Sequence, residues 1–291
     1  MRLNMHASIA INDSGLHPKR HHELTKQFGE EKSLLERTDA FYETLGLSTS
    51  VWKRLQKPKH KKIEYTLKWA EKNKVTILRD QDNHYPKQLK ELPCWPPLLY
   101  VKGNIKYLKT PGISIVGSRN ASFYGLEVTK KFAGDLARLG YSIVSGLAIG
   151  VDGTAHEACL NTNQVSIAVI GLGMDNITPA QNRHLAKRIE KQGCIISEMP
   201  LQTPYQKQCF PRRNRLISAL SMATLITEAK LSSGTLTTAQ YSIDLHRPVM
   251  AIPGRINQPQ AEGCHRLIQE GAHLVTSALD CHHIITQHIN Q

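Results

Sequence analysis

From Gly112 onward the chain alternates short β-branched runs with amphipathic segments. The runs are bounded by small, turn-forming residues, as expected of strands, and buried strands alternating with helices are typical of a parallel sheet covered on both faces. We therefore predict a doubly wound, Rossmann-like α/β domain with a mostly parallel sheet over residues 111–291. Strands are expected at 113–117, 141–146, 166–171, 194–198, 222–229, 248–254 and 273–276, with helices at about 123–139, 151–160, 181–192, 234–245 and 261–270.

The first 110 residues lack this alternation and divide into three expected segments. Residues 1–21 are polar and aperiodic, so we expect a flexible leader. Residues 22–75 carry apolar residues in short helical registers, which predicts a small helical domain. Residues 76–110 are rich in proline and are expected to form a connector packed on the α/β body. No winged-helix domain is expected after Asp280.

The net charge is +13 with a pI near 9.5, which favours a polyanion or an anionic surface as the partner. The first 110 residues carry 21 Lys and Arg against 12 Asp and Glu, so the excess is concentrated there. Part of this positive excess comes from a nearly consecutive run of basic residues, which forms either a solvated helix face or a contact with nucleic acid. The run comprises Lys53, Arg54, Lys57, Lys59, Lys61 and Lys62.

Several other classes of protein are disfavoured. The chain has no apolar run long enough to span a bilayer, and its first residues are too polar for a signal peptide, so we expect a cytoplasmic protein without a membrane partner. Its six cysteines lie far apart without the spacing of metal ligands. We expect them to be reduced thiols, with no disulfide framework and no metal site.

The turn after the first predicted strand is suited to phosphate. Gly117 allows the backbone to approach a bound group, Ser118 offers a hydroxyl, and Arg119 offers a planar fork that matches phosphate oxygens. Asn120 completes the turn. In a doubly wound sheet such turns open the ligand crevice at the carboxyl ends of the strands, where helix amino termini offer free N–H groups.

A second segment combines cations with an aromatic ring just before a helix expected to open at about Asn214. Charge can follow the phosphates of a single strand while the ring stacks on a base of any identity. Arginines at a helix amino terminus oppose its dipole, which implies a bound anion or a buried acidic partner. The candidate residues are Lys207, Phe210, Arg212, Arg213, Asn214 and Arg215.

A third turn, again leading into a predicted helix, contains Lys230, Ser233, Gly234 and Thr235. Its hydroxyls and N–H groups can cradle a second anion, with Lys230 as a point charge. We expect Glu228, at the end of the preceding strand, to act as the internal counter-ion for one of the arginines at 212–215.

A dinucleotide cofactor is not expected. The pattern G-x-G-x-x-G is absent after the first strand, and the second strand ends in Ser145-Gly146 without the acidic residue that binds a ribose. We assign no cofactor.

Taken together, the motifs resemble those of the DNA-processing protein A family, also called DprA or Smf, over about residues 85–280. The resemblance implies a cytoplasmic bacterial protein that is not an enzyme. Such a protein binds and protects incoming single-stranded DNA during natural transformation, forms a homodimer and loads the RecA recombinase. It places the phosphate pocket at Gly117, Ser118 and Arg119, with further DNA contacts at Lys207, Phe210 and Lys230. The segment at 22–75 falls where many members carry a helical module similar to sterile alpha motif or helix-hairpin-helix domains. The motifs include Val116-Gly117-Ser118-Arg119, Ser145-Gly146-Leu147-Ala148, Phe210-Pro211-Arg212-Arg213-Asn214-Arg215, Ser233-Gly234 and Ile252-Pro253-Gly254.

Two other functions remain as alternatives. Nucleotide phosphoribohydrolases of the LOG and lysine-decarboxylase-like group share this architecture, but their motif ends in a catalytic glutamate where this chain has Thr238. A hydroxyl cannot stabilise a developing ribosyl cation as a carboxylate can. A scaffold that binds acidic proteins would explain the charge but not the three turns suited to phosphate.

Overall fold

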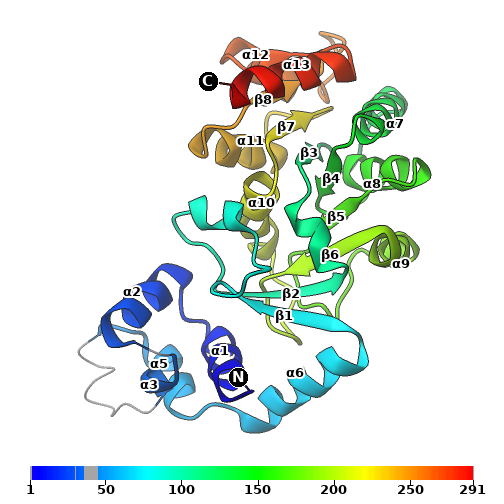
Figure 1. Cartoon of the computed structure of the whole chain (residues 1–291). Coiled ribbons are helices and arrows are strands. Elements are labelled where there is room, and N and C mark those ends of the chain that lie inside the picture. Colours follow the sequence, from blue (N-terminus) through cyan, green and yellow to red (C-terminus); the bar gives the residue numbers. More distant parts are fainter. Residues whose placement is uncertain (1, 30, 36–44, 291) are drawn as a thin grey trace.

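The computed structural model describes residues 2–29, 31–35 and 45–290, and its centre is one sheet of nine strands (Figure 1). The strand order is β1-β2-β6-β5-β4-β3-β7-β8-β9, and every pair from β6 to β9 in this order is parallel. The predicted doubly wound α/β fold is therefore confirmed. The parallel strands are β3 (Gly112–Val116), β4 (Ser142–Ser145), β5 (Ser166–Val169), β6 (Gly193–Ser197), β7 (Ala223–Ile226), β8 (Val249–Ala251) and β9 (His273–Leu274).

Helices cover both faces of the parallel strands. On one face α7 (Phe123–Arg138), α8 (Val151–Asn161) and α13 (Ala278–Ile289) pack on a core that includes Ile113 and Ile143. On the other, α10 (Cys209–Ala219), α11 (Thr235–Asp244) and α12 (Glu262–Gln269) pack on a core that includes Val116 and Val144. Both cores draw alternate residues from the same strands, so the strands are apolar throughout, as a sheet covered on both faces requires. Helix α9 (Arg183–Gln192) lies beside α8.

Residues 76–110 do more than connect, because they add two antiparallel strands to the sheet. Strand β1 (Val75–Arg79) pairs with β2 (Leu98–Gly103), and β2 pairs with β6. The short helices η1 (Lys87–Glu91) and η2 (Ile105–Lys109) flank β2. The prolines that suggested a connector all lie in the excursion between the two strands, so they interrupt neither ladder. The α/β body thus begins at Val75 rather than at residue 111.

The expected flexible leader at 1–21 is wrong, because helix α1 (Arg2–Ser14) and the start of α2 (Pro18–Phe28) occupy it. Ile9 is 2% exposed and belongs to a core shared with Ile63 and Tyr100. Burial against the neighbouring α6 and β2 stabilises this helix, and local sequence preference does not. Its sequence therefore lacks the apolar period from which a helix is predicted.

The helical region of the structure comprises α1, α2, α3 (Glu31–Leu35), α5 (Thr49–Gln56) and α6 (His60–Lys72). Its own small core contains Leu16, Leu24, Leu34 and Leu55. It contacts the α/β body through α1 on β2 and through the ring of His22, which stacks on Trp95 at 3.9 Å between centroids. Figure 1 shows this region as the lower, blue to cyan part of the molecule, beside the β1–β2 edge of the sheet.

Candidate functional site

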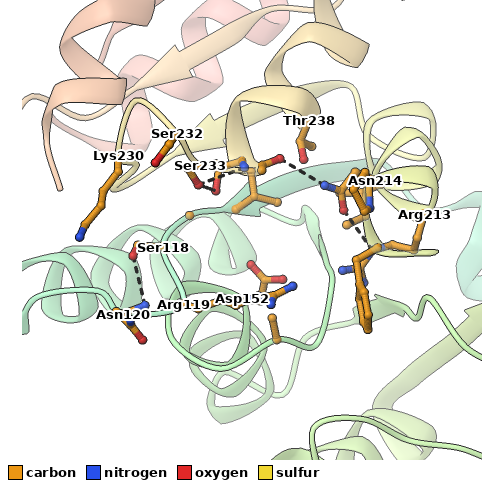
Figure 2. Close-up of a pocket in the computed structure, with 18 of the residues that line it drawn as sticks. Ser118, Arg119, Asn120, Asp152, Arg213, Asn214, Lys230, Ser232, Ser233 and Thr238 are labelled. Atoms are coloured by element: carbon orange, nitrogen blue, oxygen red, sulfur yellow. Dashed lines mark hydrogen bonds between the residues drawn. The ribbon is translucent and has the colours of Figure 1, made fainter. Parts of the chain in front are cut away.

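The order of the strands fixes where a ligand can bind. Successive strands run outward from β3 through β4, β5 and β6, and the chain then returns to place β7 on the other side of β3. The helices that follow β3 and β7 therefore diverge to opposite faces and leave a crevice at the carboxyl ends of these two strands. A cleft of about 510 Å³ lies there (Figure 2). Its walls come from the turns after β3, β4 and β7, the loop before α10, and α10 itself.

The first wall is the turn from β3 to α7, and the protein holds it by its own backbone. The amide of Ser118 donates to the carbonyl of Glu228 at 2.8 Å, and the Ser118 hydroxyl accepts from the amide of Asn120 at 3.1 Å. Arg119 extends from this turn and is exposed, and no carboxylate of the described residues lies within 4.0 Å of its guanidinium. Its positive charge is therefore available to a ligand.

A glycine of the second wall keeps this turn in place. Gly150 adopts a φ of +81°, and a methyl group there would lie 2.4 Å from the carbonyl oxygen of Ser118. Glycine alone tolerates both the left-handed backbone and the close approach. The next amide, that of Val151, donates to the same Ser118 oxygen at 3.2 Å. The amino terminus of α8 thus fixes the shape of the turn that carries Arg119.

The third wall combines two aromatic rings with a lysine. Phe210 is half-buried in the first turn of α10, and its ring lies 5.5 Å from the ring of Tyr205 and 5.5 Å from the guanidinium carbon of Arg119. Tyr205 is 59% exposed and Lys207, between the rings in sequence, is exposed as well. The loop thus brings a lysine and two aromatic rings to the same cleft, with Arg119 over the ring of Phe210, which suits stacking on a base beside a phosphate.

Arg213 forms the floor of the cleft and is a structural tether. It is 5% exposed and donates to the carbonyl oxygens of Gly146, at 2.6 Å, and of Val169. Burial lowers its pKa to about 10, while the neighbouring Asp152 acts in the opposite direction. Burial raises the pKa of Asp152, and the positive charge of Arg213 opposes this rise. Figure 2 shows both side chains at the cleft.

The remaining two arginines of the predicted basic segment do not reach the cleft. Arg212 and Arg215 line hollows on other sides of α10, and both bind the carboxylate of Glu198. The helix begins at Cys209, five residues before the predicted start at Asn214. Successive helical residues point about 100° apart, so neighbours in the sequence are sent to different faces.

The acidic partner expected for these arginines was also misassigned. Glu198, which is 5% exposed, takes that place, whereas Glu228 accepts hydrogen bonds from the amide and hydroxyl of Ser122 at 2.8 and 2.5 Å. Ser122 is the N-cap of α7, so Glu228 stabilises the start of that helix. The arginines therefore do have a buried acidic partner, as predicted, but it is Glu198, which follows β6, and not Glu228.

The fourth wall is the turn from β7 to α11. The hydroxyl of Ser233 accepts from the amide of Thr235 at 3.1 Å, and the side-chain amide of Asn214 donates to the carbonyl of Gly234 at 3.4 Å. Lys230 is exposed and forms no ion pair within the described part of the chain. The amino terminus of α11, the Ser232 and Ser233 hydroxyls and Lys230 face the same space as the first turn (Figure 2).

The cleft therefore unites twelve of the fourteen predicted residues. It also contains Tyr205, Asp152, Ala148, Ser232 and Thr238, which were not among the fourteen predicted residues. It contains three exposed cations that have no acidic partner among the described residues, together with the buried side chains of Arg213 and Asp152. The residues gathered in the cleft are Gly117, Ser118, Arg119, Asn120, Lys207, Phe210, Arg213, Asn214, Lys230, Ser233, Gly234 and Thr235.

Comparison with known proteins decides the family. The sequence profile described as DNA recombination-mediator protein A matches residues 76–286, which begins within one residue of β1. The chain belongs to the DNA recombination-mediator protein A family. Protein Smf of Escherichia coli is 43% identical over 217 residues, covering 74% of this chain and 58% of that protein. DNA processing protein DprA of Streptococcus pneumoniae is 42% identical over 200 residues, covering 68% of this chain and 70% of that protein.

Solved structures of the family share the architecture. The structure of DprA from Streptococcus pneumoniae aligns with a TM-score of 0.83 at 34% identity, over 93% of this chain and 94% of that one. DprA from Helicobacter pylori aligns with a TM-score of 0.66 at 31% identity, over 74% of this chain and 96% of that one. That second structure is described as revealing a single-stranded DNA binding mode. The chain spans just over half the length of the Smf proteins of Escherichia coli and Synechocystis.

Three further observations complete the description of this member. Among residues 2–29, 31–35 and 45–290, no group of three or more His, Cys, Asp or Glu side chains is arranged to hold a metal ion. Within the same residues no helix has the length and apolar character needed to cross a bilayer. The carboxylate of Asp152, the acid of the cleft, accepts from the amide of Gly146 at 3.1 Å.

Proposed function

We propose that the chain binds single-stranded DNA through its sugar-phosphate backbone in the cleft between β3 and β7. One observation carries this proposal: three separate segments bring Arg119, Lys207 and Lys230, which form no ion pair with any described residue, to one cleft. Helix amino termini and serine hydroxyls at the same place supply donors for phosphate oxygens. Backbone contacts of this kind position a strand without reading its sequence.

The aromatic wall favours a single strand over a duplex. Phe210 and Tyr205 lie where a base next to a bound phosphate would stack, and a base is free to stack only when it is unpaired. The solved relative from Helicobacter pylori, described by its single-stranded DNA binding mode, supports the same ligand.

In the cell we propose a recombination mediator that works in the cytoplasm during natural transformation, protects incoming single strands and loads RecA as a homodimer. Membership of the DNA recombination-mediator family supports this role. Sedimentation at micromolar protein tests the dimer: we expect twice the 32.6 kDa mass of the chain, and a monomer throughout that range contradicts it.

We further propose that the cleft binds and does not catalyse. Thr238 lines it at the position where the phosphoribohydrolase motif requires a glutamate, and Asp152 is buried against Arg213. Incubation with nucleoside monophosphates should release no free base. Turnover that Asp152→Asn abolishes would favour the enzyme instead.

The binding proposal is tested by titrating labelled oligo-dT and a duplex of equal length at two salt concentrations. We expect the single strand to bind more tightly at both, with affinity falling as salt rises because bound phosphates release counterions. Equal affinity for the two ligands would contradict the proposal.

A further inference from the structure

A second hollow lies on the other side of the loop that carries Tyr205 and Lys207. It has a volume of about 300 Å³ and is bounded by α1, α5 and α6 of the helical region and by residues 198–206 of the α/β body. The loop divides its side chains between the two hollows. Tyr205 and Lys207 line the cleft, whereas Pro204 and Gln206 line the second hollow. One exposed loop therefore separates the two.

The charge of the second hollow is not balanced within it. Its cations are Arg54, Lys62 and Arg212, of which Lys62 pairs with Asp13 and Arg212 with Glu198. Arg54 is exposed, and its Nε donates to the carbonyl of Ser50 at 2.8 Å. No described carboxylate lies within 4.0 Å of its guanidinium. Arg54 thus presents an uncompensated charge to this hollow.

The surface around Arg54 has the same character. Residues 45–74 carry nine Lys and Arg but only two Glu and no Asp. One of the two, Glu64, already binds the ring of His6 at 2.7 Å. Lys57, the C-cap residue of α5, follows Arg54 by three residues and is exposed as well, so a second cation lies about one turn from Arg54 at the end of that helix. The second hollow therefore opens onto a cationic helical surface.

We propose that α5 and the second hollow extend the DNA site, so that a strand held in the cleft crosses the 203–207 loop and sets its phosphates against Arg54 and Lys57. This rests on the proposed function of the cleft. The loop supports the path because it is polar and exposed and carries the ring of Tyr205, on which a crossing base can stack. An acidic peptide would also be attracted to the cations of α5. It would not, however, account for the continuity of this surface with the cleft across the loop.

This arrangement makes affinity depend on the length of the strand in two steps. An oligonucleotide of about 6 nucleotides is long enough for the cleft alone, since comparable single-strand sites take about 4–16 nucleotides. A strand of about 20 nucleotides is long enough to reach α5 as well. Loss of the α5 cations should therefore affect the long strand and spare the short one.

The test is the double variant Arg54→Glu, Lys57→Glu, titrated with labelled oligo-dT of both lengths at two salt concentrations. We expect the affinity for the long strand to fall about tenfold or more. The negative slope of log affinity against log salt should become shallower by about 1.4, the value for two lost phosphate contacts at about 0.7 each. The short strand should bind as tightly as it binds the wild type.

The matched control reverses two exposed lysines of α9, Lys187→Glu and Lys191→Glu, which changes the net charge equally at a helix that lines neither hollow. The proposal is overturned if the α5 variant weakens the long strand no more than this control, or weakens both lengths equally. An unchanged affinity for the long strand also overturns the proposal. The cations of α5 would then be interpreted as a site for an acidic protein. If the wild type binds neither length, the proposed function of the cleft itself fails. Arg54→Gln with Lys57→Gln repeats the test should the reversed pair unfold.

Discussion

The two turns that face each other across the cleft are built in opposite ways. In the turn after β3, a methyl group at Gly117 would lie 2.6 Å from Val151 Cγ2 and 2.9 Å from the carbonyl oxygen of Glu228. In the turn after β7, a methyl group at Gly234 would meet no atom of the described residues within 4 Å, and the φ of −62° is open to any residue. The fold requires the first glycine, and it does not require the second.

This difference separates two reasons for a small residue at a binding site. Gly117 lets β3 and β7 approach closely enough for the amide of Ser118 to reach the carbonyl of Glu228. Gly234, which has no side chain, leaves open space in front of the amino terminus of α11, where the helix favours a bound anion. We infer that the first turn is a rigid part of the packing and that the second is kept open for the ligand. Stability and binding should therefore respond differently at the two turns.

The largest effect is expected at the packed turn. Gly117→Ala should lower the free energy of unfolding by about 1–3 kcal/mol, because the added methyl group overlaps Val151 and the Glu228 carbonyl. Binding should fall with stability, since the displaced turn carries Arg119. Chemical denaturation followed by circular dichroism measures this. A variant as stable as the wild type would show that the turn yields easily and would remove the contrast.

The next effect separates charge from packing within the same turn. Arg119→Ala should weaken single-strand binding by about 1.5–3 kcal/mol, the range for hydrogen bonds to a charged group, and by the same amount for every sequence. Stability should change little, because the side chain is exposed. Anisotropy titrations with several homopolymers measure it. Full affinity in a folded variant would exclude Arg119 from the site.

The aromatic wall provides a contact that does not depend on charge. Phe210→Ala should cost about 1–3 kcal/mol of binding while leaving the salt slope nearly unchanged, since stacking releases no ion. Lys207→Ala is the matched control and should instead make that negative slope shallower by about 0.7, because one phosphate contact is lost. Should Phe210→Ala lose stability along with binding and Phe210→Leu restore both, the ring anchors the loop rather than a base.

The smallest effect is expected at the open turn. Gly234→Ala should change the free energy of unfolding by less than about 1 kcal/mol, because alanine adopts this backbone conformation without strain. Its affinity for oligo-dT should nevertheless fall, because the methyl group occupies the space in which we place a phosphate. Thermal unfolding and titration on the same preparation measure both. Unaltered affinity would show that the ligand keeps its distance from α11.

Much of this architecture could be predicted because local pattern and tertiary role agree. The strands from β3 to β8 are short apolar runs ended by turns, and their order in the sequence brings Gly117 and Gly234 to one edge of the sheet. Helix α1 could not be found in this way, since burial of Ile9 against β2 and α6 stabilises it. The pairing of β1 with β2 was hidden by the proline-rich segment between them.

The errors within the site have a common cause, which is that sequence proximity is a poor guide to direction. Arg212, Arg213 and Arg215 were grouped because they are adjacent, but α10 turns only Arg213 toward the cleft. The start of α10 was placed too late, at Asn214, although Pro211 is compatible with the first turn of a helix that begins at Cys209. Tyr205 carried no signal of its own in the sequence, and its place in the cleft and its ring contact with Phe210 reveal it.

The central claim is that the cleft holds the charged backbone of a single strand. Affinity for ordinary oligo-dT, compared with oligo-dT of equal length whose phosphates are replaced by neutral methylphosphonates, tests it most directly. We predict that the neutral strand loses most of its affinity and all of its salt dependence, because only stacking on Phe210 and Tyr205 and hydrogen bonds between neutral groups remain. Equal affinity for the two strands would contradict the account.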